Sequence, residues 1–597
     1  MDIFGVLTGI GGLALFLYGM NVMGDSLSKL SGGKMESILG RLTSTRIKAL
    51  LLGALVTAVI QSSSATTVMV VGFVNSGIMN LGQAAGIIMG ANVGTTITSW
   101  LLSLSGISGS NIFIRLLKPS SFSPVLAAVG VILTMTANNN DRKKDIGTIM
   151  LGFAVLMFGM ETMSGAVAPL ADNSAFTGML TMFSNPILGM LAGAILTAII
   201  QSSSASVGIL QALCLTGAVG YGTAIPIIMG QNIGTCVTAI ISSVGANRNA
   251  RRASMIHLYF NLIGTIIFMT VFYGINSLLH FTFLDTPASV FGIAVIHSLF
   301  NIGCAILMFP FANGLVKLAT ISVRERNDNT EVKTKTLPGE LTALDERFLS
   351  QPGFAMELCQ NAAFAMANET RECIGQALTL LINYDEDIAN EVYEKEQLID
   401  TYEDMLGTYL VKLSGRNLSV ADSKTLSILL HCTSDLERIS DHAVNILGSV
   451  EEMRDRKQEF SDKALAELMV LSEAVLDIVN MTVTVFGERD IMKARFVEPL
   501  EEVIDGLNVN LRQNHIKRLR EGRCTIELGI CFEDLITDLE RVSDHCSNIA
   551  VCLIQVNEDV FDTHEYLDEN VKQTQWFADE VRRLREIYYI PVMKEGV

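Results

Sequence analysis

The sequence Gln-Ser-Ser-Ser occurs twice, at residues 61–64 and 201–204. Each copy offers an amide, three hydroxyls and, where a helix begins, free backbone N–H groups. Such helix ends attract anions, because the unpaired N–H groups and the helix dipole favour negative charge. Two tips facing each other would therefore surround an oxyanion with hydrogen-bond donors. The residues expected to bind substrate or ions at the tips are Gln61, Ser62, Ser63, Ser64, Thr66, Gln201, Ser202, Ser203, Ser204 and Ser206.

An Asn-x-Gly-Thr sequence follows each tip, at residues 92–95 and 232–235. We expect the glycine to let the helix unwind there, so that freed carbonyls join the Asn and Thr oxygens. Oxygen ligands of this kind suit Na⁺ in transporters with broken helices. The expected ion ligands are Asn92, Thr95, Asn232 and Thr235.

Both motifs belong to a larger internal repeat with a constant offset of 140 residues. Residues 53–66 match residues 193–206, and residues 87–98 match residues 227–238. A gap-free match over such a distance indicates duplication. The repeats are expected to span about 1–140 and 141–312, within a transmembrane domain of residues 1–312.

The segments that carry the tips are too short to cross a membrane. Twelve apolar or small residues separate Lys48 from Gln61, which is about 18 Å of helix against a hydrocarbon core of roughly 30 Å. We therefore predict re-entrant hairpins at 47–79 and 187–219. The predicted spans lie near 3–24, 81–105, 121–138, 146–168, 222–244, 253–275 and 289–312.

Each repeat then holds three crossings and one hairpin, so the two copies must have opposite orientations. Inverted repeats with broken helices at the midplane are typical of secondary transporters. The charges of the loops predict the orientation: one side carries eleven Lys and Arg residues and the other only Arg115 and Lys118. By the positive-inside rule the first side is cytoplasmic. This places the N-terminus outside and the C-terminal half inside, in the cytoplasmic (inner) membrane.

The duplicated QSSSAT and QSSSAS sequences, each followed by a G-x-N-x-G-T helix, resemble the type II sodium/phosphate cotransporter family over residues 1–315. The resemblance implies Na⁺ as coupling ion, inorganic phosphate as substrate and alternating access. It also implies that the tip serines contribute to the phosphate and sodium sites. Small hydroxyl residues also serve helix packing in membranes, but two copies at equivalent depth, each preceded by Gln, favour binding.

The second half of the chain has a different composition. Residues 1–320 carry a net charge of +6 and the remaining 277 residues a net charge of −24. We expect a linker at 313–349, a soluble helical domain at 350–560 and a tail at 561–597. The acidic balance excludes nucleic acid as a partner, because phosphate backbones bind basic surfaces.

The soluble half contains its own repeat. Residues 434–447 match residues 537–550, and a 3-4 spacing of apolar residues predicts a bundle core along each of these helices. Acidic and amide residues four apart occupy another face, and such rows either are merely solvated or chelate a cation. The predicted metal ligands are Glu396, Asp400, Glu437, Asp441 and Asn445 in one copy, and Glu501, Asp505, Glu540, Asp544 and Asn548 in the other.

Both copies of E-x-x-x-D-x-x-x-N resemble the PhoU family of phosphate-signalling proteins. The resemblance implies two three-helix bundles that hold Fe or another divalent metal. Ser440 and Ser543 stand where the family motif has Gly, which is a mild departure.

Three polar residues of the membrane half leave alternatives open. Glu161 is an acid in an apolar span and is either functional or placed at the interface. His257 and His297 lie in matching H-x-x-F-N sequences, where interhelical hydrogen bonding is favoured over substrate contact.

These observations predict an all-α protein: a polytopic membrane transporter of two inverted repeats with re-entrant hairpins, joined to a PhoU-like domain. No GxxxxGK[ST] sequence or supported catalytic group occurs, so we do not expect an enzyme or an ATP-driven pump. The predicted function is sodium-coupled phosphate transport with a cytoplasmic regulatory domain. The alternatives are a phosphate exporter or a membrane-tethered signalling scaffold. Expected partners are phosphate, Na⁺, the lipid bilayer, phosphate-signalling proteins and a second copy of the chain.

Overall fold

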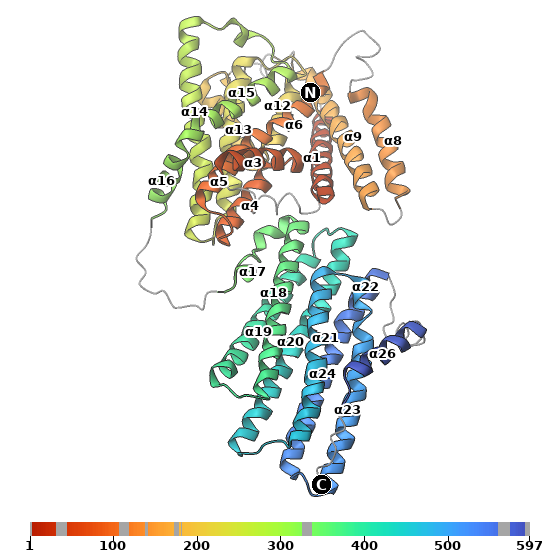
Figure 1. The fold of residues 1–597 in the computed structure, drawn as a ribbon. Coiled ribbons are helices and arrows are strands. Elements are labelled where there is room, and N and C mark those ends of the chain that lie inside the picture. Colours follow the sequence, from red (N-terminus) through yellow and green to blue (C-terminus); the bar gives the residue numbers. More distant parts are fainter. Residues whose placement is uncertain are drawn as a thin grey trace. The chain divides into compact units, whose positions relative to one another are not determined.

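The computed structural model divides the chain into two compact units, residues 1–355 and residues 356–597, which are described separately. It describes residues 3–31, 45–106, 119–137, 141–171, 173, 178, 180, 182–324, 337–558 and 574–590. Within these ranges the regular elements are helices, and the single β-bridge recorded joins Gly220 to Pro287 (Figure 1). The predicted all-α fold is confirmed.

The first unit contains both repeats. The helices of the first repeat are α1 (Ile3–Ser31), α3 (Arg46–Ile60), α4 (Ser63–Asn75), α5 (Leu81–Gly94), α6 (Thr96–Ser103) and α8 (Pro119–Met135). Those that follow are α9 (Asp141–Val167), α11 (Pro186–Ile200), α12 (Ser203–Cys214), α13 (Tyr221–Ser242), α14 (Arg248–Leu279), α15 (Val290–Met308) and α16 (Ala312–Ser322).

Helices α1 and α9 are equivalent in the two repeats and pack directly on each other. A Cβ on Gly12 would stand 2.6 Å from the backbone N of Met163, and a Cβ on Gly152 would stand 2.8 Å from the backbone N of Met23. Each residue of the first contact lies 140 positions from one of the second, so the two contacts are the same contact seen from either repeat. The start of each helix faces the end of the other. The helices are therefore antiparallel, and the repeats are inverted as predicted.

The hairpins use the same close packing in both copies. A Cβ on Gly53 of α3 would stand 2.9 Å from the carbonyl carbon of Ile87 on α5. Its equivalent on Gly193 of α11 would stand 2.9 Å from the carbonyl carbon of Ile227 on α13. Small residues let helices approach closely in membranes, where van der Waals packing carries much of the association.

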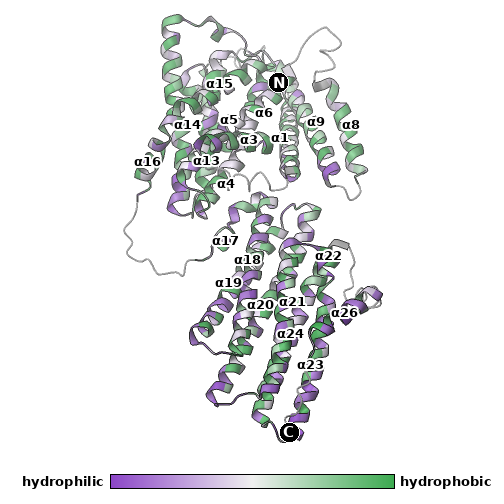
Figure 2. Ribbon diagram, in the orientation of Figure 1, coloured by the Kyte–Doolittle hydropathy of each residue, from purple (hydrophilic) through white to green (hydrophobic). Residues whose placement is uncertain are grey.

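Seven helices in the described part of the chain are long and apolar enough to span a membrane. Six coincide with predicted spans. The predicted span at 121–138 is instead a shorter apolar helix, Ser121–Met135. The seventh long helix is α21 (Asp462–Glu488) in the second unit, where half of its most apolar stretch is buried inside a soluble-type bundle. Figure 2 shows the apolar colouring concentrated on the helices of the first unit.

Part of the expected linker is folded. Residues 312–322 form α16, with Leu315 and Ala319 buried, and residues 338–355 belong to the first unit. The reason is that apolar residues 4 positions apart in this stretch pack on the transport helices, which the polar residues around them concealed.

The second unit consists of two three-helix bundles. The first contains α18 (Pro352–Leu380), α19 (Glu386–Ser414) and α20 (Val420–Asp455); the second contains α21, α23 (Val497–Arg520) and α24 (Ile526–Glu558). The predicted heptad positions of α20 and α24, from Leu429 to Val450 and from Phe532 to Leu553, are all buried. A further helix, α26 (Gln575–Ile587), packs on α23 through apolar residues including Val581 and Leu584.

Candidate functional site

The two Gln-Ser-Ser-Ser sequences form the tips of helical hairpins. Helix α3 ends at Gln61, which has a left-handed backbone with φ of 60°, and α11 ends at Gln201 with φ of 59°. The next residue begins a new helix in each copy: the side chains of Ser62 and Ser202 accept hydrogen bonds from the backbone N–H groups of Ala65 and Ala205. A serine N-cap stabilises a helix start. The predicted chain reversal therefore occurs at the predicted residues in both copies.

The two tips touch each other. Ser64 Oγ donates to the carbonyl oxygen of Gln201 at 3.2 Å. Thr98 on α6 connects them a second time: its hydroxyl donates to Gln61 Oε1 at 2.8 Å and accepts from Ser204 Oγ at 3.4 Å. The N-terminal ends of α4 and α12, one from each inverted repeat, thus converge on one polar region inside the first unit.

Charged side chains are absent from the sequence around both tips. No Asp, Glu, Lys or Arg occurs between residues 49 and 114 or between residues 173 and 247. The tips therefore offer hydroxyl, amide and backbone donors to an anion without a neutralising side chain of their own segments.

The outer hydroxyls of the tips differ between the repeats. Thr66 Oγ1 accepts from Thr57 Oγ1 at 3.0 Å, whereas the buried hydroxyls of Ser206 and Thr197, their equivalents, have no hydrogen-bond partner among the described residues. Buried polar groups are nearly always paired. The second repeat therefore has unused oxygen ligands near its tip.

The Asn-x-Gly-Thr sequences do not unwind as predicted. Helix α13 runs without interruption through residues 232–235, and the break after α5 is a single residue, Thr95, that keeps helical dihedral angles. Both glycines instead make room for a neighbouring helix: a Cβ on Gly94 or on Gly234 would stand 2.8 or 2.7 Å from the Cβ of Thr57 or Thr197. The expectation of freed carbonyls at these positions is wrong, because close packing on the hairpin requires the same residue type.

The Asn and Thr side chains of these sequences are buried but turn to nearby groups. Asn92 donates to the carbonyl of Ile88, and the Thr95 hydroxyl donates to the carbonyl of Ala91. In the second repeat Asn232 donates to Asn301 Oδ1 at 2.9 Å, and Thr235 donates to the Asn232 carbonyl. In this conformation they do not contact the tip serines.

The H-x-x-F-N residues form interhelical hydrogen bonds, the reading favoured from sequence. Asn301 pairs with Asn232, and His297 Nδ1 lies 2.8 Å from Ser99 Oγ. Ser99 also accepts through its carbonyl from Gln211, a buried residue on α12.

Sequence reasoning missed Thr98, Ser99 and Gln211 as parts of this network. A signal for Thr98 was present, since it matches Thr238 at the repeat offset of 140. Gln231 was missed as well. It is fully buried, neither end of its amide has a partner among the described residues, and Ala91 stands at the equivalent position.

Residues 338–355, the docking segment below, pack on the end of α4 opposite its tip. Phe348 is fully buried against Phe73 of α4 and Phe354, with ring centroids 5.3 and 5.0 Å away. Asp345 accepts from Asn75 Nδ2 at 2.7 Å. Polar contacts reach two further helices: Arg347 donates to the Ser242 carbonyl at the end of α13, and Gln351 accepts from Ser28 of α1. The segment is therefore anchored to both repeats.

The first predicted metal cluster is a dense group of carboxylates on α19 and α20. Burial and the neighbouring Asp441 and Asp400 raise the pKa of Glu437 to about 7. The pKa of Glu396 is also raised, by burial and by Asp400 and Asp441. These shifts place four of the five predicted residues within electrostatic reach. Asn445 instead donates to Asp538 on α24, at 3.4 Å.

The second cluster brings together three carboxylates from α23 and α24. Ligand oxygens of Glu501, Asp505 and Asp544 all lie within 4.8 Å of one another. Glu540 is turned away: its Oε2 accepts from Asn508 Nδ2 at 2.6 Å and lies 3.9 Å from Arg512 Nη2. Asn548 lies 3.5 Å from Asp435 instead of joining the carboxylates.

The chemistry of both donor sets fits a hard or borderline divalent cation, which prefers carboxylate oxygens. The sets differ in charge. Arg512 and Asn508 in the second copy correspond, at the offset of 105 residues, to Gly407 and Glu403 in the first. The first cluster is therefore the more acidic one.

Two buried His–Asp pairs join the bundles at their centre. His442 Nδ1 lies 2.8 Å from Asp538 Oδ1, and His545 Nδ1 lies 2.9 Å from Asp435 Oδ1. The two imidazole rings stack with centroids 5.7 Å apart. The pairs relate α20 to α24 by the internal repeat of this unit.

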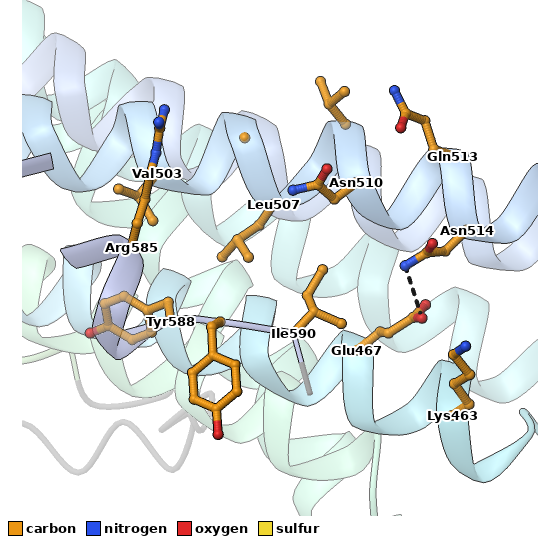
Figure 3. A pocket seen from close by; sticks show the side chains of 13 residues that line it. Lys463, Glu467, Val503, Leu507, Asn510, Gln513, Asn514, Arg585, Tyr588 and Ile590 are labelled. Atoms are coloured by element: carbon orange, nitrogen blue, oxygen red, sulfur yellow. Dashed lines mark hydrogen bonds between the residues drawn. The ribbon is translucent and has the colours of Figure 1, made fainter. Parts of the chain in front are cut away.

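A cavity of about 820 Å³ lies between α21, α23 and the end of α26 (Figure 3). Its walls combine amides such as Asn510 with the aliphatic side chains of Val503 and Leu507. Glu467 at its edge is held by Asn514 at 3.1 Å and by Arg518 at 2.6 Å. The single carboxylate in the wall is thus neutralised by the protein itself.

Comparison with known proteins identifies both units. The Na+/Pi-cotransporter family model matches residues 15–165 and again residues 155–296. The PhoU domain model matches residues 365–450 and 468–553. The two matches in each unit coincide with the internal repeats.

Individual relatives cover different parts of the chain. A Salmonella typhimurium protein named "Putative inorganic phosphate export protein YjbB" is 24% identical over 573 residues, covering 93% of this chain and 99% of its own length. The Bacillus subtilis protein YqeW, named as uncharacterized, is 30% identical over 51% of this chain and 94% of its own length. The human protein named "Sodium-dependent phosphate transport protein 2B" is 32% identical over 137 residues, which cover 21% of this chain and 20% of its own length. PhoU from Pseudomonas aeruginosa, a solved structure, is 21% identical over 34% of this chain and 97% of its own, with a TM-score of 0.33.

Proposed function

This chain belongs to the Na+/Pi-cotransporter family and carries the PhoU domain twice, and from this premise we propose that it moves inorganic phosphate across the cytoplasmic membrane together with Na⁺. The observation that carries the proposal is the contact between the two hairpin tips, through Ser64 with Gln201 and through Thr98 with Gln61 and Ser204.

The tips suit a small oxyanion. Two helix N-termini from inverted repeats direct their free N–H groups and their serine hydroxyls to one place. Phosphate would be held there by donors alone, and its charge needs a cation in the same buried region. Because the tip segments contain no Lys or Arg, co-bound Na⁺ supplies that charge, which couples the two solutes. The unpartnered oxygens of Ser206, Thr197 and Gln231 are the ligands we assign to it.

The inverted repeats support alternating access. Helices α1 and α9 meet in an antiparallel, pseudo-symmetric contact, so each repeat can adopt the conformation of the other. This exchange would open the shared site first to one side and then to the other.

Outward transport is the second candidate, favoured by relatives that cover nearly the whole chain and are named for phosphate export. The same tips serve either direction, since net flux follows the gradients of phosphate and Na⁺.

We assign the PhoU-like unit a regulatory role on the cytoplasmic side, with a divalent cation bound by its carboxylate clusters. The docking segment supports this role, because it leads directly into α18 of that unit and packs on the end of α4, whose other end is a tip. A helix of 13 residues spans about 20 Å, so a change at Phe348 reaches Ser63 through one rigid element.

Phosphate flux in proteoliposomes tests the proposal. Purified protein should transport radiolabelled phosphate under a Na⁺ gradient and not under an equal K⁺ gradient, with inside-out and right-side-out vesicles measured separately to give the direction. Ser63→Ala and Ser203→Ala should each reduce transport, while Thr270→Ala, a control on the exposed face of α14, should not. Transport that is equal in Na⁺ and K⁺, or unaffected by both serine substitutions, contradicts the proposal.

A further inference from the structure

A cavity of about 380 Å³ opens between α1, α8 and α9, away from the tips. Apolar side chains from all three helices line it, with two polar exceptions, Ser123 and Glu161. Volumes of this size are in the range of small-molecule sites. Neither transport nor the PhoU-like unit, as described above, uses this cavity.

Glu161 is an acid on the exposed face of a membrane-spanning helix, and it forms no ion pair with any described residue. A lone carboxylate at the edge of the hydrocarbon region is costly unless a cation accompanies it. It lies 20 residues beyond Asp141, about 30 Å along the helix. Since Arg142, Lys143 and Lys144 mark one membrane surface, Glu161 lies near the opposite surface.

Ser123 is the second polar group in the cavity. Its side chain is 6% exposed, and its hydroxyl has no hydrogen-bond partner among the described residues. A buried hydroxyl without a partner is unusual, and in a lined cavity it points to a missing acceptor.

The order of these groups along the membrane normal follows from the packing of α8 on α9. A Cβ on Gly130 would stand 2.7 Å from the carbonyl of Gly147 and 3.1 Å from the backbone N of Leu151, so the helices are antiparallel. Ser123, seven residues earlier on α8, then lies level with residues 154–158 of α9, and Glu161 lies about one turn further out.

We propose that this cavity binds one phospholipid whose headgroup ends in a primary ammonium. The acyl chain lies along Ala127, Ala154 and Val155. The phosphodiester accepts a hydrogen bond from the Ser123 hydroxyl, and the ammonium pairs with Glu161. The sequence of apolar wall, hydroxyl donor and outermost carboxylate matches the order of chain, phosphodiester and ammonium in such a lipid. A lipid whose headgroup lacks a cation would leave Glu161 unpaired.

Lipid retention by the full-length protein tests this inference. The protein is reconstituted in nanodiscs that contain equal amounts of phosphatidylethanolamine and phosphatidylglycerol with the same acyl chains, then transferred to detergent, and the retained lipids are counted by native mass spectrometry. We expect one phosphatidylethanolamine to be retained in roughly tenfold preference, the equivalent of one exposed ion pair of about 1.4 kcal/mol. Glu161→Gln should abolish the preference and Ser123→Ala should weaken retention.

Two matched variants keep the test decisive. Lys118→Gln removes a nearby cation of the sequence and should leave the preference unchanged; loss in this variant as well as in Glu161→Gln would overturn direct pairing with the lipid. Thr162→Ala, next to Glu161 and bonded only within its own helix turn, should also behave as the parent protein. Equal retention of both lipids, or burial of the cavity by a second copy of the chain, would overturn the inference. Elution at the parent volume in size exclusion shows that each variant is folded.

Discussion

The ring of Phe348 fills the space beside Gly72, with its Cε1 and Cζ atoms 2.7 Å from where a Cβ on that glycine would stand. Gly72 belongs to α4, the helix that begins at the first tip, and Phe348 belongs to the segment that leads to the PhoU-like unit. One glycine in the transport domain thus forms the seat for one aromatic ring of the regulatory connection.

We predict that Gly72→Ala displaces Phe348 and releases the docking segment from α4. The methyl group overlaps the ring, and overpacking of this kind costs about 1–3 kcal/mol. Limited proteolysis should then cleave residues 338–355 faster than in the parent protein. Gly77→Ala is not a suitable control, because Gly77 has a positive φ; Gly82→Ala, whose nearest neighbour is a side-chain oxygen of Asn80 at 3.3 Å, is.

Phe348→Ala tests the same contact from the other side and adds a functional measurement. Removing a fully buried ring typically costs about 3–5 kcal/mol in local stability. If docking transmits the state of the PhoU-like unit, transport should become independent of divalent cations. Transport that still responds to them in the undocked variant would show that regulation takes another route.

Thr98→Ala should impair phosphate transport more than the equivalent change in the other repeat, Thr238→Ala. Thr98 bonds to Gln61 and Ser204, whereas the Thr238 hydroxyl has no partner among the described residues. Loss of one such hydrogen bond is worth about 0.5–1.5 kcal/mol, or roughly a three- to tenfold loss in apparent affinity for phosphate. Equal effects of the two substitutions would indicate that the bridge at Thr98 is not special.

Metal binding at the first acidic cluster should strengthen as the pH rises from 6 to 8. Glu437 has a pKa raised from 4.5 to about 7, chiefly by burial and then by Asp441 and Asp400. Protons therefore compete with the cation below pH 7. Without metal the sign is opposite: the raised pKa stabilises the fold fully below pH 4.5, and this contribution is lost as the pH rises through 7. Titration with Mn²⁺ at several pH values checks the first statement, and Glu437→Gln should flatten the dependence.

Arg512→Gly should increase the affinity of the second cluster for a divalent cation. Arg512 lies 2.5 Å from Glu533 and 3.9 Å from Glu540, and it corresponds to Gly407 in the first cluster. Removing a cation near the carboxylates raises the local negative potential. The reciprocal change, Gly407→Arg, should weaken the first cluster, and isothermal titration of both variants with Mn²⁺ compares them directly. An unchanged affinity in both would show that the neighbouring arginine does not set metal affinity.

Gly19→Ala should destabilise the contact between α1 and α9, while Gly11→Ala on the same helix should not. A Cβ on Gly19 would overlap backbone atoms of Leu156, whereas nothing lies within 4 Å of a Cβ on Gly11. Overpacking against backbone costs about 1–3 kcal/mol, which should appear as a lower thermal midpoint in detergent.

The sequence by itself determined the repeats, the inversion and the chain reversals at the tips. These features depend on local residue types: a hydrophobic segment of 12 residues cannot cross a bilayer, and Gln61 and Ser62 end one helix and begin the next whatever surrounds them. The heptad positions of α20 and α24 were predictable for the same reason, because burial follows helical periodicity.

Only the tertiary structure decided which side chains complete the sites. Thr98 lies 37 residues from Gln61 and 106 from Ser204, so only the packing of three helices makes it a bridge. Gly94 and Gly234 were read as points of unwinding, but a glycine suits both unwinding and close packing, and the neighbouring hairpin selected the second. The same holds for Glu540, which Arg512 and Asn508 draw away from the other carboxylates. Spacing within one helix specifies which residues share a face, whereas the partner of that face depends on contacts between segments far apart in the chain.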